Sequence, residues 1–286
     1  MKLHIVGSGC PDARQERYGS ACLLEVGTDM LMVDCGPATT YKMACMNIAP
    51  TAVSHVFLTH HHFDHNVDLP CFVLTRWDQL GPRSADPLPV YGPPPTVAFV
   101  EKLLGDEGAF YDDWYARIMT PASQILHEGR GGALPRPGPA VAAQDLKSGD
   151  VVEGDGWTVK AIWVHHVEPW LESLAFRVDT DQGSVVFSGD AGPCPELTEF
   201  CQGAEVLVVC CAYQVGSGLH PDIATAVTGA VDAGDIAREC QPKTIVLTHT
   251  TGAFSAPGGR EKAIAEVSRG YDGRIVFADE LTSIAL

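Results

Sequence analysis

Short apolar runs separated by glycines dominate the first part of the chain, a pattern that predicts β-strands. We expect strands at 3–6, 21–26, 30–34 and 54–58. The first three follow one another closely and predict a β-meander, and a helix is expected at 39–47. The last of these strands leads directly into a loop that is rich in histidine.

The second half repeats the strand pattern. Strands are expected at 157–164, 174–178, 184–188, 205–210 and 244–248, and one helix at 224–240. Many short strands in two halves, each with helices, predict two packed sheets flanked by helices.

A different pattern separates these halves. A proline-rich stretch at 81–95, a predicted helix at 96–104 and an irregular stretch at 129–139 come between them. Strand patterns resume at once beyond 139, so we interpret this part as a loop rather than a domain boundary. The prediction is a single domain over 1–286 with a loop and helix insertion at about 76–140.

Composition narrows the class of protein. Of the 286 residues 45% are hydrophobic, and 19 Lys and Arg oppose 36 Asp and Glu for a net charge of −17. That charge repels a polyanion, so nucleic acid is not the expected partner.

The chain has no basic leader and no run of about 18 apolar residues, which predicts a cytoplasmic protein outside the membrane. Its ten cysteines are scattered through apolar stretches and are expected to be reduced, buried thiols.

The stretch THHHFDH, at 59–65, carries the strongest chemical signal. In an extended segment His60 and His62 can point the same way, whereas the adjacent Asp64 and His65 diverge. Imidazole nitrogen and carboxylate oxygen are the ligands expected of zinc, or of iron and manganese where more oxygen is present. The spacing therefore favours a site for two metals.

Other predicted strands also end in metal-binding side chains. Asp190 follows the strand at 184–188, His249 follows the strand at 244–248, and the pair His165 and His166 follows the strand at 157–164. Strand alternation allows either histidine of that pair to face the metals. Strands that converge on one edge can assemble such a site from residues far apart in sequence.

The HxHxDH motif at 60–65 resembles that of the metallo-β-lactamase superfamily of hydrolases. The chain is most similar to the branch that contains ribonuclease Z, small phosphodiesterases and certain arylsulfatases, through its segments 7–9, 17–20, 33–36, 188–190 and 247–249. This resemblance implies an α/β (α+β) fold, an αββα four-layer sandwich with the metal site at one edge of the two sheets. It also implies a homodimer.

The resemblance assigns the ligands of a binuclear site. One metal takes His60, His62 and a histidine of the 165/166 pair, the other takes Asp64, His65 and His249, and Asp190 bridges the two. The sequence after His166 resembles the family's third-histidine segment, which favours His166 over His165. His61 is then a spacer. We expect two zinc ions, with manganese or iron as the alternatives.

Two such metals activate water for hydrolysis. Asp64 is a candidate to orient the attacking water, and Asp34 is expected to support a ligand rather than to bind metal. His220, ahead of the predicted helix, is the candidate acid for the leaving group. Ribonuclease Z carries a histidine closer to that helix, where this chain has 226–229, so the match is loose there.

The expected substrate is a small ester: a phosphodiester, an aryl sulfate, a lactone or another activated ester. Aromatic side chains near the ligands, with Trp170 preferred, are candidates to wall its pocket or to pack the core. The alternatives are a tRNA 3′-end processing endonuclease, a hydrolytic dehalogenase of an aromatic, and a non-catalytic metal-binding sensor. The short, irregular 129–139 stretch holds only Arg130 and Arg136, which weighs against a tRNA-gripping arm.

Overall fold

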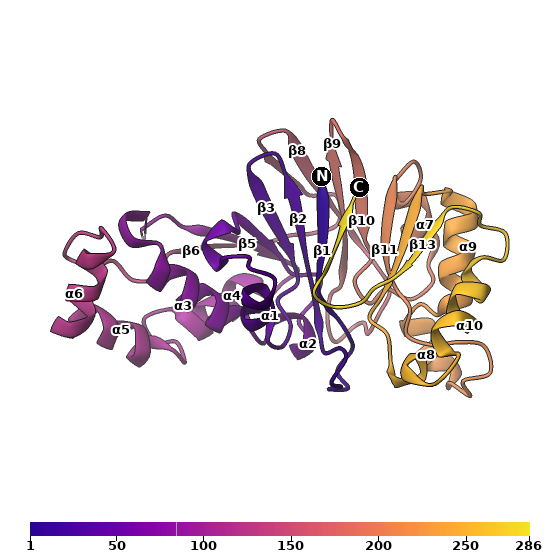
Figure 1. Ribbon diagram of the computed structural model, residues 1–286, viewed down its shortest axis with the longest axis horizontal. Helices are drawn as coiled ribbons and strands as arrows, with labels where there is room; N and C mark the ends of the chain where they lie inside the picture. The colour runs from indigo at the N-terminus through magenta and orange to yellow at the C-terminus, as the bar shows by residue number, and fades with distance from the viewer. Residues whose placement is uncertain (84) are drawn as a thin grey trace.

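The computed structural model describes residues 1–83 and 85–286, which form two seven-stranded sheets. The first sheet has the order β14-β1-β2-β3-β4-β5-β6 and the second the order β13-β12-β11-β10-β9-β8-β7. Helices cover the outer faces of the pair of sheets, with α3 and α4 on one side and α7, α9 and α10 on the other (Figure 1). The predicted αββα sandwich is confirmed.

The strand bounds are close to those expected. The first sheet contains β1 (Lys2–Ser8), β2 (Ser20–Val26), β3 (Asp29–Val33), β4 (His55–Phe57), β5 (Leu88–Gly92), β6 (Val141–Asp145) and β14 (Thr282–Ala285). The second contains β7 (Val151–Gly154), β8 (Trp157–Trp163), β9 (Leu174–Thr180), β10 (Gly183–Phe187), β11 (Val206–Cys210), β12 (Thr244–Thr248) and β13 (Arg274–Phe277).

The helices fill the loops between these strands. They are α1 (Thr39–Cys45), α2 (Phe63–Asn66), α3 (Leu69–Gln79), α4 (Thr96–Leu104), α5 (Tyr111–Met119), α6 (Pro121–Gly129), α7 (Pro195–Phe200), α8 (Pro221–Ala226), α9 (Ala230–Cys240) and α10 (Gly259–Val267). Three short 3₁₀ turns are at Pro50–Ala52, Gly81–Arg83 and Gly252–Ser255. No helix within 1–83 and 85–286 combines the length and the apolar character needed to cross a bilayer.

Strand direction brings the functional loops to one edge. β3 to β6 run parallel in the first sheet, and β10 to β13 run parallel in the second. The carboxyl ends of parallel strands meet at one edge of a sheet, where binding sites of α/β proteins form. The short helices α2 and α8 lie at this edge, which is the lower one in Figure 1.

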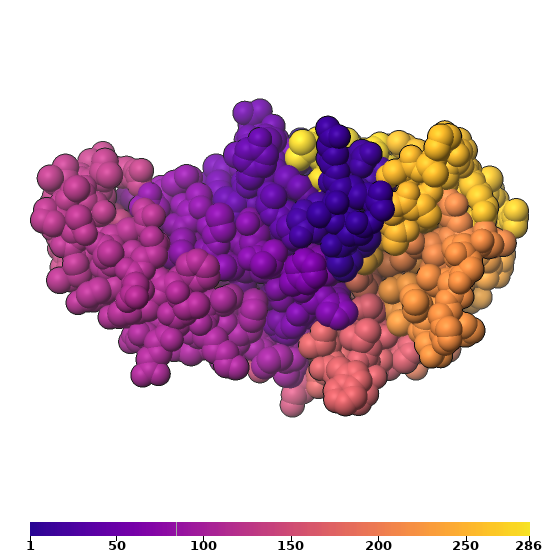
Figure 2. Space-filling model, turned by 90° about the horizontal axis from the view of Figure 1, so that it is seen from below, coloured from indigo at the N-terminus to yellow at the C-terminus, as the bar shows by residue number. Residues whose placement is uncertain are grey.

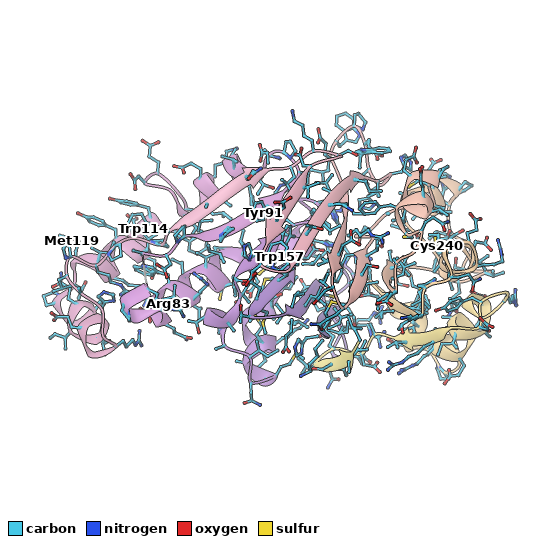
Figure 3. The ribbon with its side chains drawn as sticks, turned by 90° about the horizontal axis from the view of Figure 1, so that it is seen from above. Arg83, Tyr91, Trp114, Met119, Trp157 and Cys240 are labelled. Atoms are coloured by element: carbon cyan, nitrogen blue, oxygen red, sulfur yellow. The ribbon has the colours of Figure 1, made fainter. Side chains whose placement is uncertain are left out.

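Aromatic side chains fill part of the space between the sheets. The ring of Phe57, on β4, lies 5.0 Å from that of Tyr91 and 5.5 Å from that of Phe176. Trp157, on β8, approaches the same ring edge-on at 6.4 Å, and Figure 3 shows it near Tyr91 between the sheets. Edge-to-face contacts of this kind add to the burial of apolar surface. This packing holds the two sheets against each other and so keeps the strand ends at the lower edge in place.

The sequence-based expectation for one region was wrong. The helix expected at 224–240 is divided into α8 and α9, because Val227 and Gly229 are extended. Thr228, between them, donates its hydroxyl to the Ala191 carbonyl at 2.6 Å and accepts the Ala212 N–H through its own carbonyl at 2.9 Å. These tertiary bonds outweigh local helix propensity.

The insertion also holds more regular structure than expected. The strand β5 lies within the proline-rich stretch, and α5 and α6 project beyond the end of the first sheet (Figure 1). Trp114, of α5, is buried and donates its indole N–H to the Leu104 carbonyl at 3.1 Å. The helical part of the insertion is therefore packed onto α4.

Candidate metal centre

The histidine-rich loop is tied to the end of the neighbouring strand β3. Asp34 follows β3 with a φ of 62° and is buried. Its carboxylate accepts the Thr59 N–H at 2.8 Å and the Thr59 hydroxyl at 3.0 Å. Aspartate tolerates this left-handed conformation better than most residues. The loop that starts at Thr59 is thereby held in one position above both strands.

Two groups of side chains at this edge could hold metal ions. The first group is His60, His62, His166 and Asp190, whose ligand atoms all lie within 4.8 Å of one another. Nδ1 of His62 is 2.9 Å from Nε2 of His60 and 3.2 Å from Nε2 of His166. Oδ2 of Asp190 lies 3.8 Å from Nε2 of His60. Three nitrogens and one oxygen form a ligand set suited to zinc.

The second group is Asp64, His65, His249 and, again, Asp190. Oδ2 of Asp190 lies 3.2 Å from Nε2 of His65 and 3.0 Å from Nε2 of His249. Oδ2 of Asp64 lies 3.2 Å from the same nitrogen of His249. Asp190 belongs to both groups and therefore stands between two candidate metal positions.

The electrostatics of this buried cluster suit a divalent cation. Burial and the nearby His65 lower the pKa of His60 well below its usual value. Burial opposes charge on His65 as well, but the carboxylates of Asp190 and Asp34 outweigh it and raise the pKa of His65 to about 10. Nε2 of His65, Oδ1 of Asp64 and Oδ1 of Asp190 are buried without a hydrogen-bond partner among the described residues. Buried polar atoms are normally satisfied, so a metal is a fitting partner for them.

Hydrogen bonds behind the histidines decide which ring nitrogen faces the cluster. Nδ1 of His65 lies 2.7 Å from Oδ2 of Asp34, and Nδ1 of His60 lies 3.0 Å from the Thr59 hydroxyl. Nδ1 of His166 donates to the Ala226 carbonyl at 2.7 Å. Such contacts orient the ring and leave Nε2 free for a metal. The sequence predicted that Asp34 supports a ligand in this way. Nothing in the sequence indicates that Thr59 and Ala226 also orient ligand histidines.

The structure separates the neighbouring histidines that the sequence left open. His61 turns away from both groups, and its Nε2 lies 3.1 Å from the Pro93 carbonyl and 3.0 Å from the Thr96 hydroxyl. His165 is partly exposed and pairs with Glu168 at 2.9 Å. His166 is buried and joins the first group. The geometry thus agrees with His166 as the ligand and His61 as the spacer.

Replacement of each histidine of this pair tests that assignment. His166→Ala is expected to lower the metal content towards one ion per chain, because only two imidazoles of the first group remain. His165→Ala is the matched control and should retain the wild-type content. Elemental analysis of both purified variants is the measurement, and loss of metal in His165→Ala alone would reverse the assignment.

His220 lies apart from both groups. Its side chain is 68% exposed, and its Nδ1 accepts the Asp222 N–H at 3.3 Å as the N-cap of α8. It is in neither metal-binding group. Its role as the acid for the leaving group stays a prediction.

The aromatic side chains near the motif in sequence have different environments. Trp77 is buried, donates to the Pro137 carbonyl at 2.9 Å and lies 3.8 Å from the Arg136 guanidinium. Trp77 and Trp114 thus pack the insertion. Trp170 is instead exposed on the loop that follows His166.

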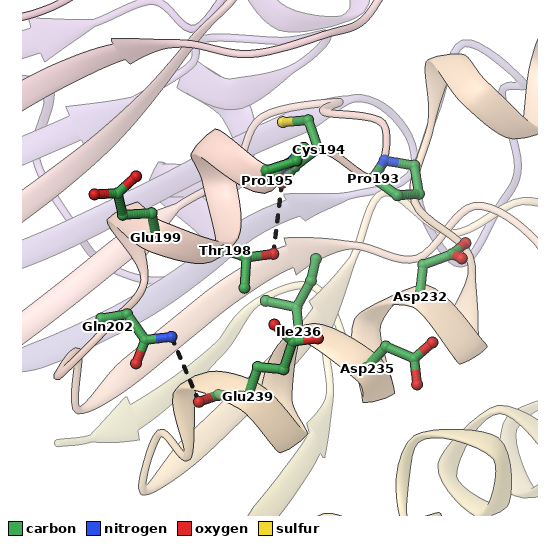
Figure 4. Close-up of a pocket in the computed structure, with 10 residues that line it drawn as sticks. All are labelled: Pro193, Cys194, Pro195, Thr198, Glu199, Gln202, Asp232, Asp235, Ile236 and Glu239. Atoms are coloured by element: carbon green, nitrogen blue, oxygen red, sulfur yellow. Dashed lines mark hydrogen bonds between the residues drawn. The ribbon is translucent and has the colours of Figure 1, made fainter.

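A separate hollow of about 590 Å³ lies between α7 and α9 (Figure 4). Its lining includes the apolar side chain of Ile236 and the carboxylates of Glu199, Asp232, Asp235 and Glu239. None of its lining residues belongs to either metal-binding group.

Comparison with known proteins places the chain in a family. The family model described as anti-Pycsar protein Apyc1 matches residues 1–83. Ribonuclease Z of Mycobacterium avium (strain 104) is 30% identical over 286 residues, which cover 98% of this chain and 96% of that protein. Ribonuclease Z of Mycobacterium bovis (strain BCG / Pasteur 1173P2) is 27% identical over 289 residues, with the same coverage of both chains.

Solved structures agree with the fold. The metallo-β-lactamase fold protein YhfI from Bacillus subtilis matches with a TM-score of 0.74 and 17% identity, over 99% of this chain and 98% of that one. Fold and ligand groups together define a metal-dependent hydrolase of the metallo-β-lactamase superfamily. Within that superfamily, the chain belongs to the ribonuclease Z family.

Proposed function

We propose that this protein hydrolyses a small phosphodiester at two zinc ions. The observation that carries the proposal is that two four-residue groups share the buried carboxylate of Asp190. His60, His62 and His166 would hold one ion, and Asp64, His65 and His249 the other. When bound, such a pair of ions supplies an activated water and stabilises the charge that develops on the ester.

The chain's own residues orient the reactants. Asp64 would hold one metal through Oδ2, while its Oδ1 is buried without a protein partner and could accept a hydrogen bond from the attacking water. Asp34 and Thr59 hold the ligand imidazoles in place from behind. We retain His220 as the candidate proton donor for the leaving group, which requires the exposed segment ahead of α8 to approach the substrate.

Two observations support this choice of substrate. The ribonuclease Z family supports the type of bond, and the net charge of the chain supports the small size of the substrate. Cleavage of RNA by the ribonuclease Z relatives is hydrolysis of a phosphodiester. This chain carries a net charge of −17, which disfavours association with a long polyanion. A small phosphodiester satisfies both observations. Maturation of tRNA is the second candidate, because of the same relatives.

Metal content and turnover test this proposal together. Protein purified without added metal is expected to hold about two ions per chain, with zinc as the main element. It should hydrolyse bis(4-nitrophenyl) phosphate much faster than 4-nitrophenyl sulfate or 4-nitrophenyl acetate, and it should leave precursor tRNA intact.

Other outcomes of that experiment identify the competing functions. Preference for the sulfate would indicate an arylsulfatase, and cleavage of the precursor tRNA at its 3′ end would indicate a processing nuclease. Two bound ions without turnover of any ester would favour a metal-binding sensor.

We also propose that the protein is cytoplasmic, because its ten cysteines are free thiols and reduced thiols persist in the cytoplasm. Seven of them are buried as expected, whereas Cys45 and Cys71 are exposed and Cys194 is partly exposed. We further propose that the protein forms a homodimer, as the family resemblance implies.

A further inference from the structure

Trp170 is the most exposed large hydrophobic side chain of the described residues, with 85% of its surface accessible. The loop that carries it is held in place by hydrogen bonds. The Trp170 N–H donates to the Val167 carbonyl at 3.1 Å, and the His166 N–H donates to the Glu168 carboxylate at 3.0 Å. An indole displayed in this way forgoes the stabilisation that burial would give. One exposed apolar side chain is ordinary, whereas several that lie together mark a binding surface, so the neighbours of Trp170 decide its meaning.

The loop position brings Trp170 close to the metal centre. His166 is a member of the first group, and residues Val167 to Trp170 form the turn closed by the hydrogen bond above. Consecutive Cα atoms are about 3.8 Å apart, and the ends of a four-residue turn lie within about 7 Å of each other. The indole is therefore attached one tight turn away from a candidate metal ligand.

Two more exposed apolar side chains come from elements that meet at His166. Phe63 is 50% exposed and directly follows His62, whose Nδ1 is 3.2 Å from Nε2 of His166. Ile223 is 49% exposed on α8, whose last residue, Ala226, accepts the His166 Nδ1–H. Figure 2 looks onto this edge, where the pink segment after β8 projects between the purple and the orange parts of the chain. We call Phe63, Trp170 and Ile223 the apolar rim.

The segments that carry the apolar rim disfavour one class of substrate. The ranges 60–75, 161–176 and 211–237 contain acidic residues and no lysine or arginine, although a lysine or arginine stands directly beside them at 76, 160, 177 and 238. Binding of a phosphate chain depends on such cations. These segments therefore offer apolar and aromatic contacts to a substrate. They do not offer the row of cations that would bind the phosphates of a long nucleic acid.

We propose that Trp170 binds an aromatic ring of the substrate, so that the preferred substrate is a phosphodiester with a single negative charge and an aryl group or nucleobase beside the scissile bond. Phe63 and Ile223 complete the apolar surface around that ring. This proposal rests on the proposed phosphodiesterase function and extends it to the choice of substrate. Stacking of a base on an aromatic side chain changes affinity by roughly tenfold or more.

Three phosphodiesters separate the contribution of the ring from that of the chemistry. Bis(2,2,2-trifluoroethyl) phosphate has no ring, bis(4-nitrophenyl) phosphate has aryl rings, and thymidine 5′-(2,2,2-trifluoroethyl phosphate) has a nucleobase as its only aromatic ring. Trp170→Ala is expected to lower kcat/KM by about tenfold or more for at least one of the ring-bearing esters. The ring-bearing ester whose kcat/KM falls more in Trp170→Ala shows whether the bound ring is an aryl group or a nucleobase. The ringless ester should react as with wild type.

Two control variants accompany this substitution. Trp170→Phe retains an aromatic ring and should keep most of the preference for ring-bearing esters over the ringless ester. Tyr115→Ala removes an exposed aromatic side chain (43% accessible) from α5, in the projecting insertion, and should change nothing. Equal rates for wild type and Trp170→Ala on all three esters would overturn the proposal and leave the phosphodiesterase function intact.

A binding measurement separates failure of this proposal from failure of the proposed function. Isothermal titration of the metal-loaded protein with thymidine 5′-monophosphate and with phenyl phosphate requires no turnover. Weaker binding of either by Trp170→Ala, with no hydrolysis of any ester by wild type, would support the ring site and refute the phosphodiesterase. No binding and no turnover by wild type would refute both.

Discussion

Asp190→Ala is expected to lose bound metal and hydrolytic activity together. Oδ2 of Asp190 lies 3.0 Å from Nε2 of His249, 3.2 Å from Nε2 of His65 and 3.8 Å from Nε2 of His60, and thus contributes to both metal-binding groups. Without it, each group keeps only three side chains, and the positive charge of two nearby ions is no longer offset between them. Metal-ion catalysis is worth several kcal/mol, so activity should fall by at least about 100-fold.

Elemental analysis, circular dichroism and the rate on bis(4-nitrophenyl) phosphate check this expectation. Asp235→Ala is the matched control, because that carboxylate is exposed on α9 and pairs only with Arg238 among the described residues. It should retain wild-type metal content and rate. Two ions per chain in folded Asp190→Ala protein would disprove the bridging role.

The sequence predicted the parts of the fold in which local pattern and tertiary environment agree. The strands β10 to β12 each contain an apolar run, at 185–187, 206–210 and 245–247, because both of their faces are buried. Side chains that follow such strands are brought to one edge by parallel pairing. Asp190 and His249 could therefore be placed beside the histidine motif before the fold was known.

The errors arose where tertiary contacts decide the local structure. Strand β5 contains Pro89, and the density of prolines around it indicated a loop. Leu88, Val90 and Gly92 are buried in alternation with their neighbours, as in a strand, but the sequence LPVYG shows no matching alternation of apolar and polar residues. The break between α8 and α9 depends on Thr228, whose partners Ala191 and Ala212 are distant in sequence.

The choice between His165 and His166 had the same difficulty. Strand β8 ends at Trp163, so both histidines follow it in a loop, where strand alternation no longer applies. His166 is oriented by the carbonyl of Ala226, sixty residues further along the chain. His220 was considered because it precedes a helix, but sequence proximity does not reveal that its side chain faces solvent.

Asp34→Asn is expected to weaken metal binding while largely preserving the fold. Asparagine tolerates a φ of 62° and can still accept the Thr59 N–H through its carbonyl oxygen. Its amide, however, would donate to Nδ1 of His65, where the carboxylate accepts in the wild type. Nδ1 then acts as the acceptor and Nε2 carries the proton, which blocks the nitrogen that faces the second group. Contacts of this kind change metal affinity by about 10- to 100-fold.

Asp34→Ala separates the role in metal binding from the role in stability. Alanine also removes the acceptor for the buried Thr59 N–H, which costs about 1–3 kcal/mol, and it is strained at a positive φ. The metal-free alanine variant should therefore unfold at a lower denaturant concentration than metal-free Asp34→Asn, while both bind zinc more weakly than wild type in competition with a chelator. If Asp34→Asn binds two zinc ions with wild-type affinity, Asp34 does not control the protonation of His65 and acts only as a structural acceptor for the loop.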